Sequence, residues 1–145
     1  MYFHHPQILD VIQILKKKLI GNLISIKSKF GINILKKKNF LGKEILKKQD
    51  INNRLFNEDL GGGVILDLGC YPTSFCILVA SLYFDLDINK IKVKTNSKQF
   101  GTTGVEIDSS ASINFNNMIN AEVETSFIRN IGSESEIIGD KGKLL

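Results

Sequence analysis

A long apolar segment, residues 63–84, limits what this chain can fold into more than any other part of its sequence. As a helix it would be apolar almost all round, and such a helix needs the rest of the chain to cover it. Glycines occupy positions 61–63, and Pro72 lies within the segment. The sequence therefore predicts a buried helix that begins after a turn and is kinked or restarted near Pro72.

The rest of the chain has the patterns of one more helix and several strands. Apolar residues recur at helical spacing over residues 6–19, and they alternate with polar residues over residues 23–30. After residue 87 the period is two, which is typical of half-buried strands. These strands are predicted at residues 91–95, 105–115, 121–128 and 134–138, with turns at residues 116–117 and 139–142. Residues 31–59 fit neither pattern, and we expect a long excursion there with one short helix near residues 42–49.

Together these elements predict an α+β fold, in which two main helices pack on one face of an open-faced, mixed and largely antiparallel sheet. A chain of 145 residues is long enough for one domain with a single core. Inspection of the sequence finds no signal peptide and no apolar stretch of the ~20 residues that a membrane span needs. We therefore expect a cytoplasmic protein with no membrane partner.

Lysine and cysteine usage exclude two further classes of function. The net charge is +4 at pH 7, and lysines occur in runs at residues 16–18, 36–38 and 47–48. Arginines and interleaved aromatic residues, which read and stack on bases, are scarce, so we interpret the runs as solvated faces and expect no nucleic-acid partner. Cys70 and Cys76 lie six positions apart within the apolar segment, a spacing that does not suit a zinc site. Both are expected to be reduced core thiols.

Asp67 and Tyr71 are the residues of the apolar segment that can carry chemistry. Positions i and i+4 share one face of a helix, so the carboxylate and the phenol are expected side by side. A phenol loses its proton only near pH ~10 in water, so acid–base work at neutral pH needs a nearby cation or dipole. Two structural alternatives stay open: Asp67 caps or pairs within a buried helix, and Tyr71 is a core tyrosine with a satisfied hydroxyl.

The start of the segment also resembles the first motif of the Rossmann-like methyltransferases, in which an acid and glycines end a strand. In this chain Tyr71 and Pro72 stand where the backbone needs glycine to approach the cofactor. The downstream pattern predicts hairpins, whereas a Rossmann fold needs βαβ units. These departures disfavour a methyltransferase.

Residues 60–72 more closely resemble the signature of the Gfo/Idh/MocA oxidoreductases. The similarity is to the branch with tyrosine after the Asp-x-Gly-x step, which includes dihydrodiol dehydrogenase and glucose–fructose oxidoreductase. Residues 1–7 resemble the family's Met-Tyr-Arg-x-His-Pro-Gln segment, and residues 138–144 resemble its Gly-x-x-Gly hairpin. Phe3 departs from this pattern, because the family often has arginine there.

The resemblance implies the C-terminal domain of an NAD- or NADP-dependent oxidoreductase, which binds the substrate and mediates oligomerisation. It implies that Tyr71 is the catalytic proton donor or acceptor and that Asp67 orients the substrate. His5 and Arg54 are expected to bind the substrate, although a polar group at a helix start and a solvated loop arginine explain them as well. Gly62 and Gly63 are expected to bind the cofactor through a turn that passes close to the dinucleotide, without forming a phosphate cradle.

The same resemblance implies the partners. They are a small-molecule polyol or carbonyl substrate, a Rossmann-domain partner, and further copies of the chain through an exposed apolar sheet face. The sequence contains no Gly-x-Gly-x-x-Gly and no Glu-Lys-Pro step. We therefore expect a fragment or one half of a split protein that is inactive without its Rossmann partner. The alternative is a non-catalytic fragment or protein-interaction module.

Overall fold

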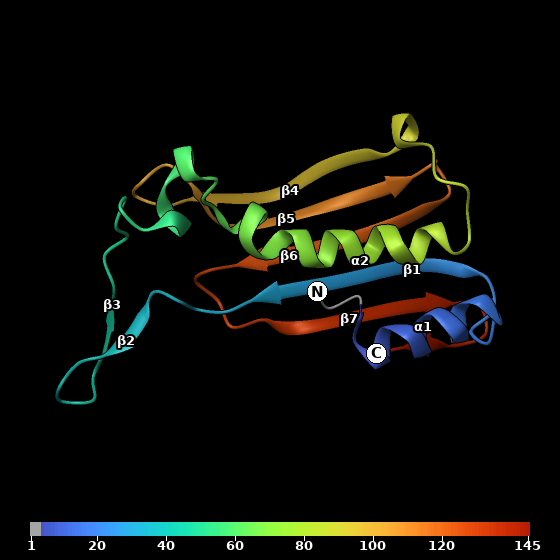
Figure 1. Cartoon of the computed structure of the whole chain (residues 1–145), viewed down its shortest axis with the longest axis horizontal. Coiled ribbons are helices and arrows are strands. Elements are labelled where there is room, and N and C mark those ends of the chain that lie inside the picture. Colours follow the sequence, from blue (N-terminus) through green and yellow to red (C-terminus); the bar gives the residue numbers. More distant parts are fainter. Residues whose placement is uncertain (1–3) are drawn as a thin grey trace.

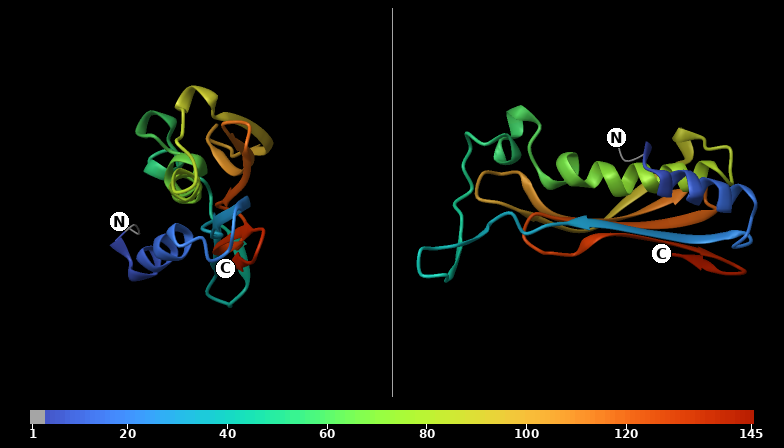
Figure 2. Two further views of the ribbon diagram at one scale, coloured as in Figure 1. Left: turned by 90° about the vertical axis from the view of Figure 1, so that its right-hand side faces the viewer. Right: turned by 60° about the horizontal axis from the view of Figure 1, so that its bottom comes forward.

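The computed structural model describes residues 4–145 and contains a six-stranded sheet with two helices on one face (Figure 1). Helix α1 (Pro6–Lys16) and helix α2 (Cys70–Ser81) lie beside each other on that face, and the described residues place no helix on the other (Figure 2). The strands are β1 (Leu23–Gly31), β4 (Lys92–Phe100), β5 (Glu106–Phe115), β6 (Ile119–Ser126), β7 (Gly132–Gly139) and β8 (Lys143–Leu144). This arrangement confirms the predicted α+β fold.

The sheet is mixed, as predicted. Its strand order is β4-β5-β6-β1-β7-β8. Strands β1 and β6 are parallel, and every other neighbouring pair is antiparallel. The turn between β7 and β8 docks on the connection from α1 to β1, where the Asp140 carboxylate accepts hydrogen bonds from the backbone and side-chain nitrogens of Asn22. This contact holds the turn against the end of α1.

The apolar segment forms two kinds of helix. A π-helix, η4 (Ile65–Gly69), leads directly into α2. The irregularity predicted at Pro72 therefore lies just before it, and Pro72 itself occupies the first turn of α2, where a missing N–H costs little. The helical stretch Glu58–Ser81 contains an 18-residue window with a mean hydropathy of 1.6 and is long enough to cross a membrane, contrary to the sequence inspection. Half of that window is buried inside the fold, where α2 contributes Phe75, Cys76 and Val79 to the core.

Two clusters of buried side chains form the core. The larger lies between the two helices and the sheet and includes Leu15, Ile26 and Val79. The smaller lies at the start of α2 and includes Phe56 and Phe127, whose rings meet edge to face with centroids 6.0 Å apart. The second cluster joins the excursion after β1 to the sheet.

The excursion contains a hairpin where we predicted a short helix. Strands β2 (Lys36–Lys38) and β3 (Glu44–Leu46) pair antiparallel, and we call residues 36–48 the arm. Asn39 closes its turn by accepting hydrogen bonds from the backbone N–H groups of Leu41 and Lys43, which explains why this Lys- and Asn-rich segment is not helical. The arm extends beyond the end of the sheet (Figures 1 and 2). Short 3-10 helices follow at η2 (Arg54–Phe56), η3 (Glu58–Leu60) and, after α2, η5 (Ile88–Lys90).

The open face of the sheet is polar, so the prediction of an exposed apolar face was wrong. Lys27 of β1 pairs with Glu122 of β6 at 3.6 Å, and Lys29 pairs with Glu134 of β7 at 2.9 Å. These side chains alternate along the strands with core residues and stand opposite one another in register. Because these side chains are charged, they form no apolar patch that could drive association through this face. Each exposed ion pair also contributes little stability.

Candidate functional site

The loop before η4 carries Arg54 and is held by its own hydrogen bonds. Asn53 and Asn57 cap the two short helices, each by accepting a backbone N–H two residues further on. The N–H of Gly62 donates to the carbonyl of Asn57 at 2.8 Å, and that of Gly63 donates to the carbonyl of Leu55 at 2.9 Å. A Cβ at Gly62 would lie 2.6 Å from two backbone carbonyl oxygens, so the loop can close only on glycine.

This loop brings Arg54 to Asp67. The Arg54 guanidinium donates a charge-assisted hydrogen bond from Nη2 to Oδ1 of Asp67 in the π-helix. The Asp67 side chain is 22% exposed and the Arg54 side chain 56% exposed, so the pair sits at the surface with the carboxylate set deeper. Sequence reasoning singled out both residues but did not connect them, because they are thirteen positions apart and meet only through the fold of the loop between them.

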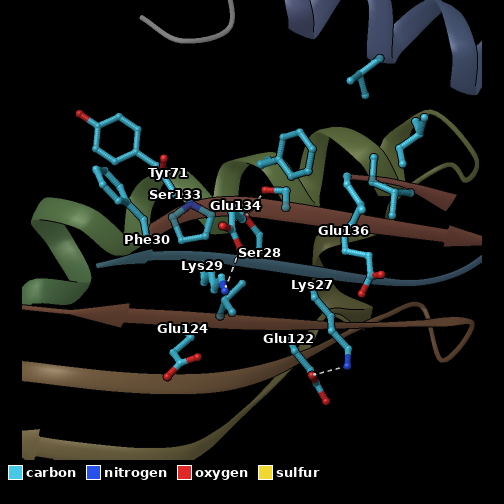
Figure 3. Close-up of a pocket in the computed structure, with 18 of the residues that line it drawn as sticks. Lys27, Ser28, Lys29, Phe30, Tyr71, Glu122, Glu124, Ser133, Glu134 and Glu136 are labelled. Atoms are coloured by element: carbon cyan, nitrogen blue, oxygen red, sulfur yellow. Dashed lines mark hydrogen bonds and ion pairs between the residues drawn. The ribbon is translucent and has the colours of Figure 1, made fainter. Parts of the chain in front are cut away.

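Tyr71 lies on the first turn of α2 and is 43% exposed, so it is not a core tyrosine. Its ring meets that of Phe30 edge to face, with centroids 5.6 Å apart and an interplanar angle of 67°. Figure 3 shows the two rings together near Ser133, with Lys27 and Glu122 toward the other side of the sheet. Phe30, at the end of β1, is a site residue that sequence reasoning missed, although its place at the end of an alternating strand was visible.

A groove runs beside Tyr71 between α1 and α2, and we call it the α1–α2 groove. Tyr71 and Phe75 line it from α2, and Gln7 and Val11 line it from α1. The helix-facing residues Ser28 and Phe30 of β1 and Ser133 and Ser135 of β7 contribute to its floor, and charged residues of the same strands, such as Lys29 and Glu134, line the cavity as well. The groove thus joins the matched phenol to a partly apolar cavity that is open to solvent.

His5 caps α1, so a structural role explains it. Its Nδ1 accepts a hydrogen bond from the backbone N–H of Gln7 at 3.3 Å, and Pro6 occupies the first helical position. His5 is exposed and does not line the α1–α2 groove, whereas Gln7 does. Phe3, which departs from the family pattern, lies outside the described residues.

The two thiols differ in environment. Cys76 is fully buried, and burial raises the pKa of its thiol to about 12. Cys70 is exposed next to Tyr71, so the prediction of two core thiols holds for Cys76 alone. Among residues 4–145, no cluster of three or more His, Cys, Asp or Glu side chains is arranged to hold a metal ion.

A second charged cluster, on the open face, was not foreseen. Arg129 donates to both carboxylate oxygens of Asp108 at 2.7 and 2.9 Å, and its Nη1 lies 2.7 Å from Glu124. Ser126 donates to Asp108 as well, at 2.7 Å. Burial raises the pKa of Asp108, but the hydrogen bonds from Arg129 and Ser126 together lower it below its ordinary value. The cluster ties β5 to the segment that follows β6.

Comparison with known proteins settles the family. The family description "GFO/IDH/MocA C-terminal domain" matches residues 8–145. The chain belongs to this family. A trans-1,2-dihydrobenzene-1,2-diol dehydrogenase from Xenopus tropicalis is 25% identical over 134 residues, which cover 92% of this chain and 34% of that protein.

Solved structures share the fold of this GFO/IDH/MocA C-terminal domain. The 3-ketoreductase KijD10 from Actinomadura kijaniata, crystallised with NADP and TDP-benzene, aligns over 99% of this chain and 38% of its own, with a TM-score of 0.68 and 21% identity. The aldose-aldose oxidoreductase from Caulobacter crescentus, complexed with glycerol, aligns over 93% and 36%, with a TM-score of 0.66 and 16% identity. The chain thus spans roughly a third of the length of these relatives.

Proposed function

We propose that this chain is the substrate-side domain of an NAD(P)-dependent oxidoreductase that acts on CH–OH groups of sugar-like or diol substrates. It works with a dinucleotide-binding domain, the partner that the family resemblance implies. The observation that supports this proposal best is the position of Tyr71: the residue that matches the family's proton-transfer tyrosine is exposed at the mouth of the α1–α2 groove.

Tyr71 moves the proton in this proposal. When a substrate alcohol is oxidised, its hydroxyl proton passes to the Tyr71 oxygen, and in the reverse reaction the phenol returns it to the carbonyl oxygen. Asp67 orients the substrate in this proposal, and Arg54 fixes the position of that carboxylate by pairing with one of its oxygens. The exposure of Tyr71 allows a cation from another domain to approach the phenol.

The bound dinucleotide supplies the hydride acceptor. The glycine loop does not form a phosphate cradle for it, because the N–H groups of Gly62 and Gly63 donate within the chain. Gly62 and Gly63 stay predicted contacts of the cofactor through close approach of the backbone alone. Purified as 145 residues, the chain is therefore expected not to bind NADPH.

The proposal includes location and assembly. We propose a cytoplasmic protein, which is supported by its two free thiols. We also propose that copies associate through the open sheet face, with its charged side chains as the contacts in place of the apolar patch predicted from the sequence.

The test is a Tyr71→Phe variant in the protein that joins this domain to its dinucleotide-binding domain, on one chain or two. General acid–base catalysis contributes ~10²–10⁴-fold to rate, so kcat should fall by at least ~100-fold while KM changes little. Tyr83→Phe is the matched control, since Tyr83 donates a hydrogen bond to the carbonyl of Gly21 at 3.2 Å, outside the groove. Unchanged turnover in Tyr71→Phe would remove this tyrosine from the mechanism.

A further inference from the structure

Hydroxyl side chains form part of the floor of the α1–α2 groove, at sheet positions that face the helices. Ser28 of β1 stands opposite Ser135 of β7, and their Oγ atoms are 2.7 Å apart. The preceding helix-facing pair on the same strands, Ile26 with Ile137, is buried at 0% and 1% exposure. The floor therefore changes from aliphatic to hydroxyl side chains within two residues, where the groove opens.

One hydroxyl proton of the serine pair remains available for a hydrogen bond to a ligand. Two hydroxyls carry two protons, and the bond between Ser28 and Ser135 uses one of them. Within residues 4–145, neither hydroxyl makes another hydrogen bond. Ser28 is only 5% exposed, whereas Ser135 is half-buried, so Ser135 faces the groove and Ser28 holds it in place.

Folding alone gives only a small reason for this pair, since a cross-strand hydroxyl pair stabilises a sheet by about 0.2–1 kcal/mol. When both partners of a buried hydrogen bond are replaced by apolar groups, stability is nearly unchanged or rises. Positions that face the helices next to Ile26 and Ile137 would accept small apolar side chains. The hydroxyls are therefore better explained by a ligand that reaches the floor.

Aromatic rings complete the surroundings of the serines. Phe30 follows Ser28 on the same face of β1 and stands opposite Ser133, an exposed third hydroxyl. Tyr71 packs against Phe30. Sites for small molecules combine apolar walls with a few convergent polar groups, and this combination fits a ring with one apolar face and a hydroxyl-bearing edge.

We propose that Ser135 and Ser133 bind adjacent hydroxyls of a polyhydroxylated ring, a sugar or cyclic polyol, while Phe30 covers one face of that ring. Ser28 is a positioning residue for Ser135. This proposal rests on the proposed function in one respect: the proposed function places the reacting carbon of the substrate next to Tyr71. Neighbouring hydroxyls of a sugar both donate and accept, as the serines do, which gives the site a preference for diols over single alcohols.

The test is binding to the 145-residue chain by saturation-transfer NMR, with methyl α-D-glucopyranoside, UDP-glucose and cyclohexanol as probes. The wild-type chain should bind the glucoside in preference to cyclohexanol. A Ser28→Ala/Ser135→Ala variant should lose about 10-fold or more in affinity for the glucoside, the fold-change that corresponds to one good hydrogen bond. Its melting temperature should not fall below that of the wild type.

The chain offers a matched control on the open face. Ser97 and Ser110 form a second cross-strand hydroxyl pair, also 2.7 Å apart, so Ser97→Ala/Ser110→Ala makes the same chemical change on the opposite face of the sheet from Ser28 and Ser135. Equal loss of binding in both variants, undiminished binding in the groove variant, or no binding of either sugar probe by the wild type each overturns the proposal. If binding depends on Ser28 and Ser135, tighter binding of UDP-glucose than of the glucoside assigns a sugar nucleotide, and equal binding assigns a free sugar.

The binding test of the serine subsite can be distinguished from the turnover test of Tyr71. In a Tyr71→Phe background the ring at position 71 still packs against Phe30, so adding Ser28→Ala/Ser135→Ala should still weaken glucoside binding by about 10-fold. Sugar binding without any effect of Tyr71→Phe on turnover would refute the proposed function and leave the subsite standing. Slower turnover in Tyr71→Phe without any sugar binding by the 145-residue chain would refute the subsite alone.

Discussion

A Gly62→Ala substitution separates two explanations of the glycine loop. Gly62 has no positive φ, so alanine is compatible with its backbone conformation, and the whole effect of the substitution comes from contacts. The added Cβ would lie 2.6 Å from the carbonyl oxygens of Arg54 and Asn57 and 2.8 Å from the nitrogen of Asn57. These are backbone atoms, so the loop has to move by about 0.8 Å to reach ordinary contact distance.

The expected cost follows from that movement. Overpacking of this kind costs about 1–3 kcal/mol, and the hydrogen bond from Gly62 to Asn57 adds about 1 kcal/mol when it is lost. We expect a loss of about 3 kcal/mol in the free energy of unfolding, which for a chain of this size lowers the melting temperature by roughly 6–12 °C. The displaced loop also carries Arg54 away from Asp67.

Thermal and denaturant unfolding of the 145-residue chain, without cofactor, measures this effect. Gly142→Ala is the control, since its Cβ would meet only Ile20 Cγ2 at 3.9 Å and its φ is not positive. That control should stay within about 1 kcal/mol of the wild type. If Gly62→Ala proves as stable as the control, the packing argument fails, and approach to a dinucleotide becomes the reason for glycine at this position.

Three further predictions concern other parts of the domain. Because the pKa of Asp108 lies below its ordinary value, the stability that its carboxylate contributes is full above pH ~4 and is lost as pH falls through the folded-state pKa. Asp108→Asn should therefore have a lower melting temperature than the wild type at pH 7, and the difference should shrink below pH ~4. A difference that does not depend on pH would contradict this. Cys70 should react with Ellman's reagent in the native protein and Cys76 only after unfolding, whereas equal native rates would disprove the burial of Cys76. The arm can be shortened by replacing residues 37–45 with Asn-Gly, which forms a two-residue turn between the register partners Lys36 and Leu46. The melting temperature should change by less than about 3 °C, because the side chains of the removed strand residues are exposed. A larger loss would mean that the arm packs on the domain.

The fold could be predicted because its signals are local. An apolar helix has to be buried, and the alternating pattern after residue 87 predicts the strands of the sheet that buries it. The same alternation placed Lys27 and Lys29 on one face of β1, so the polar open face was also visible in the sequence. The expectation of an apolar face came from the family's mode of association and disregarded this pattern.

The site could be predicted only in part because its geometry depends on tertiary contacts. Asp67 and Tyr71 were found from their spacing and from the family signature. The pairing of Arg54 with Asp67 depends on two asparagine caps and on the close packing of Gly62, none of which has a periodic signal. The contact of Phe30 with Tyr71 depends on how α2 crosses β1.

One measurement tests directly whether this domain supplies the proton-transfer group of an oxidoreductase. It is the single-turnover rate of NADP reduction by a polyol, in the protein that contains this domain and its dinucleotide-binding domain. We expect Tyr71→Phe to slow that turnover by at least ~100-fold while substrate affinity stays within a few-fold of the wild type. Wild-type single-turnover rates in Tyr71→Phe, with Tyr83→Phe as the reference, would contradict the proposed role of the domain.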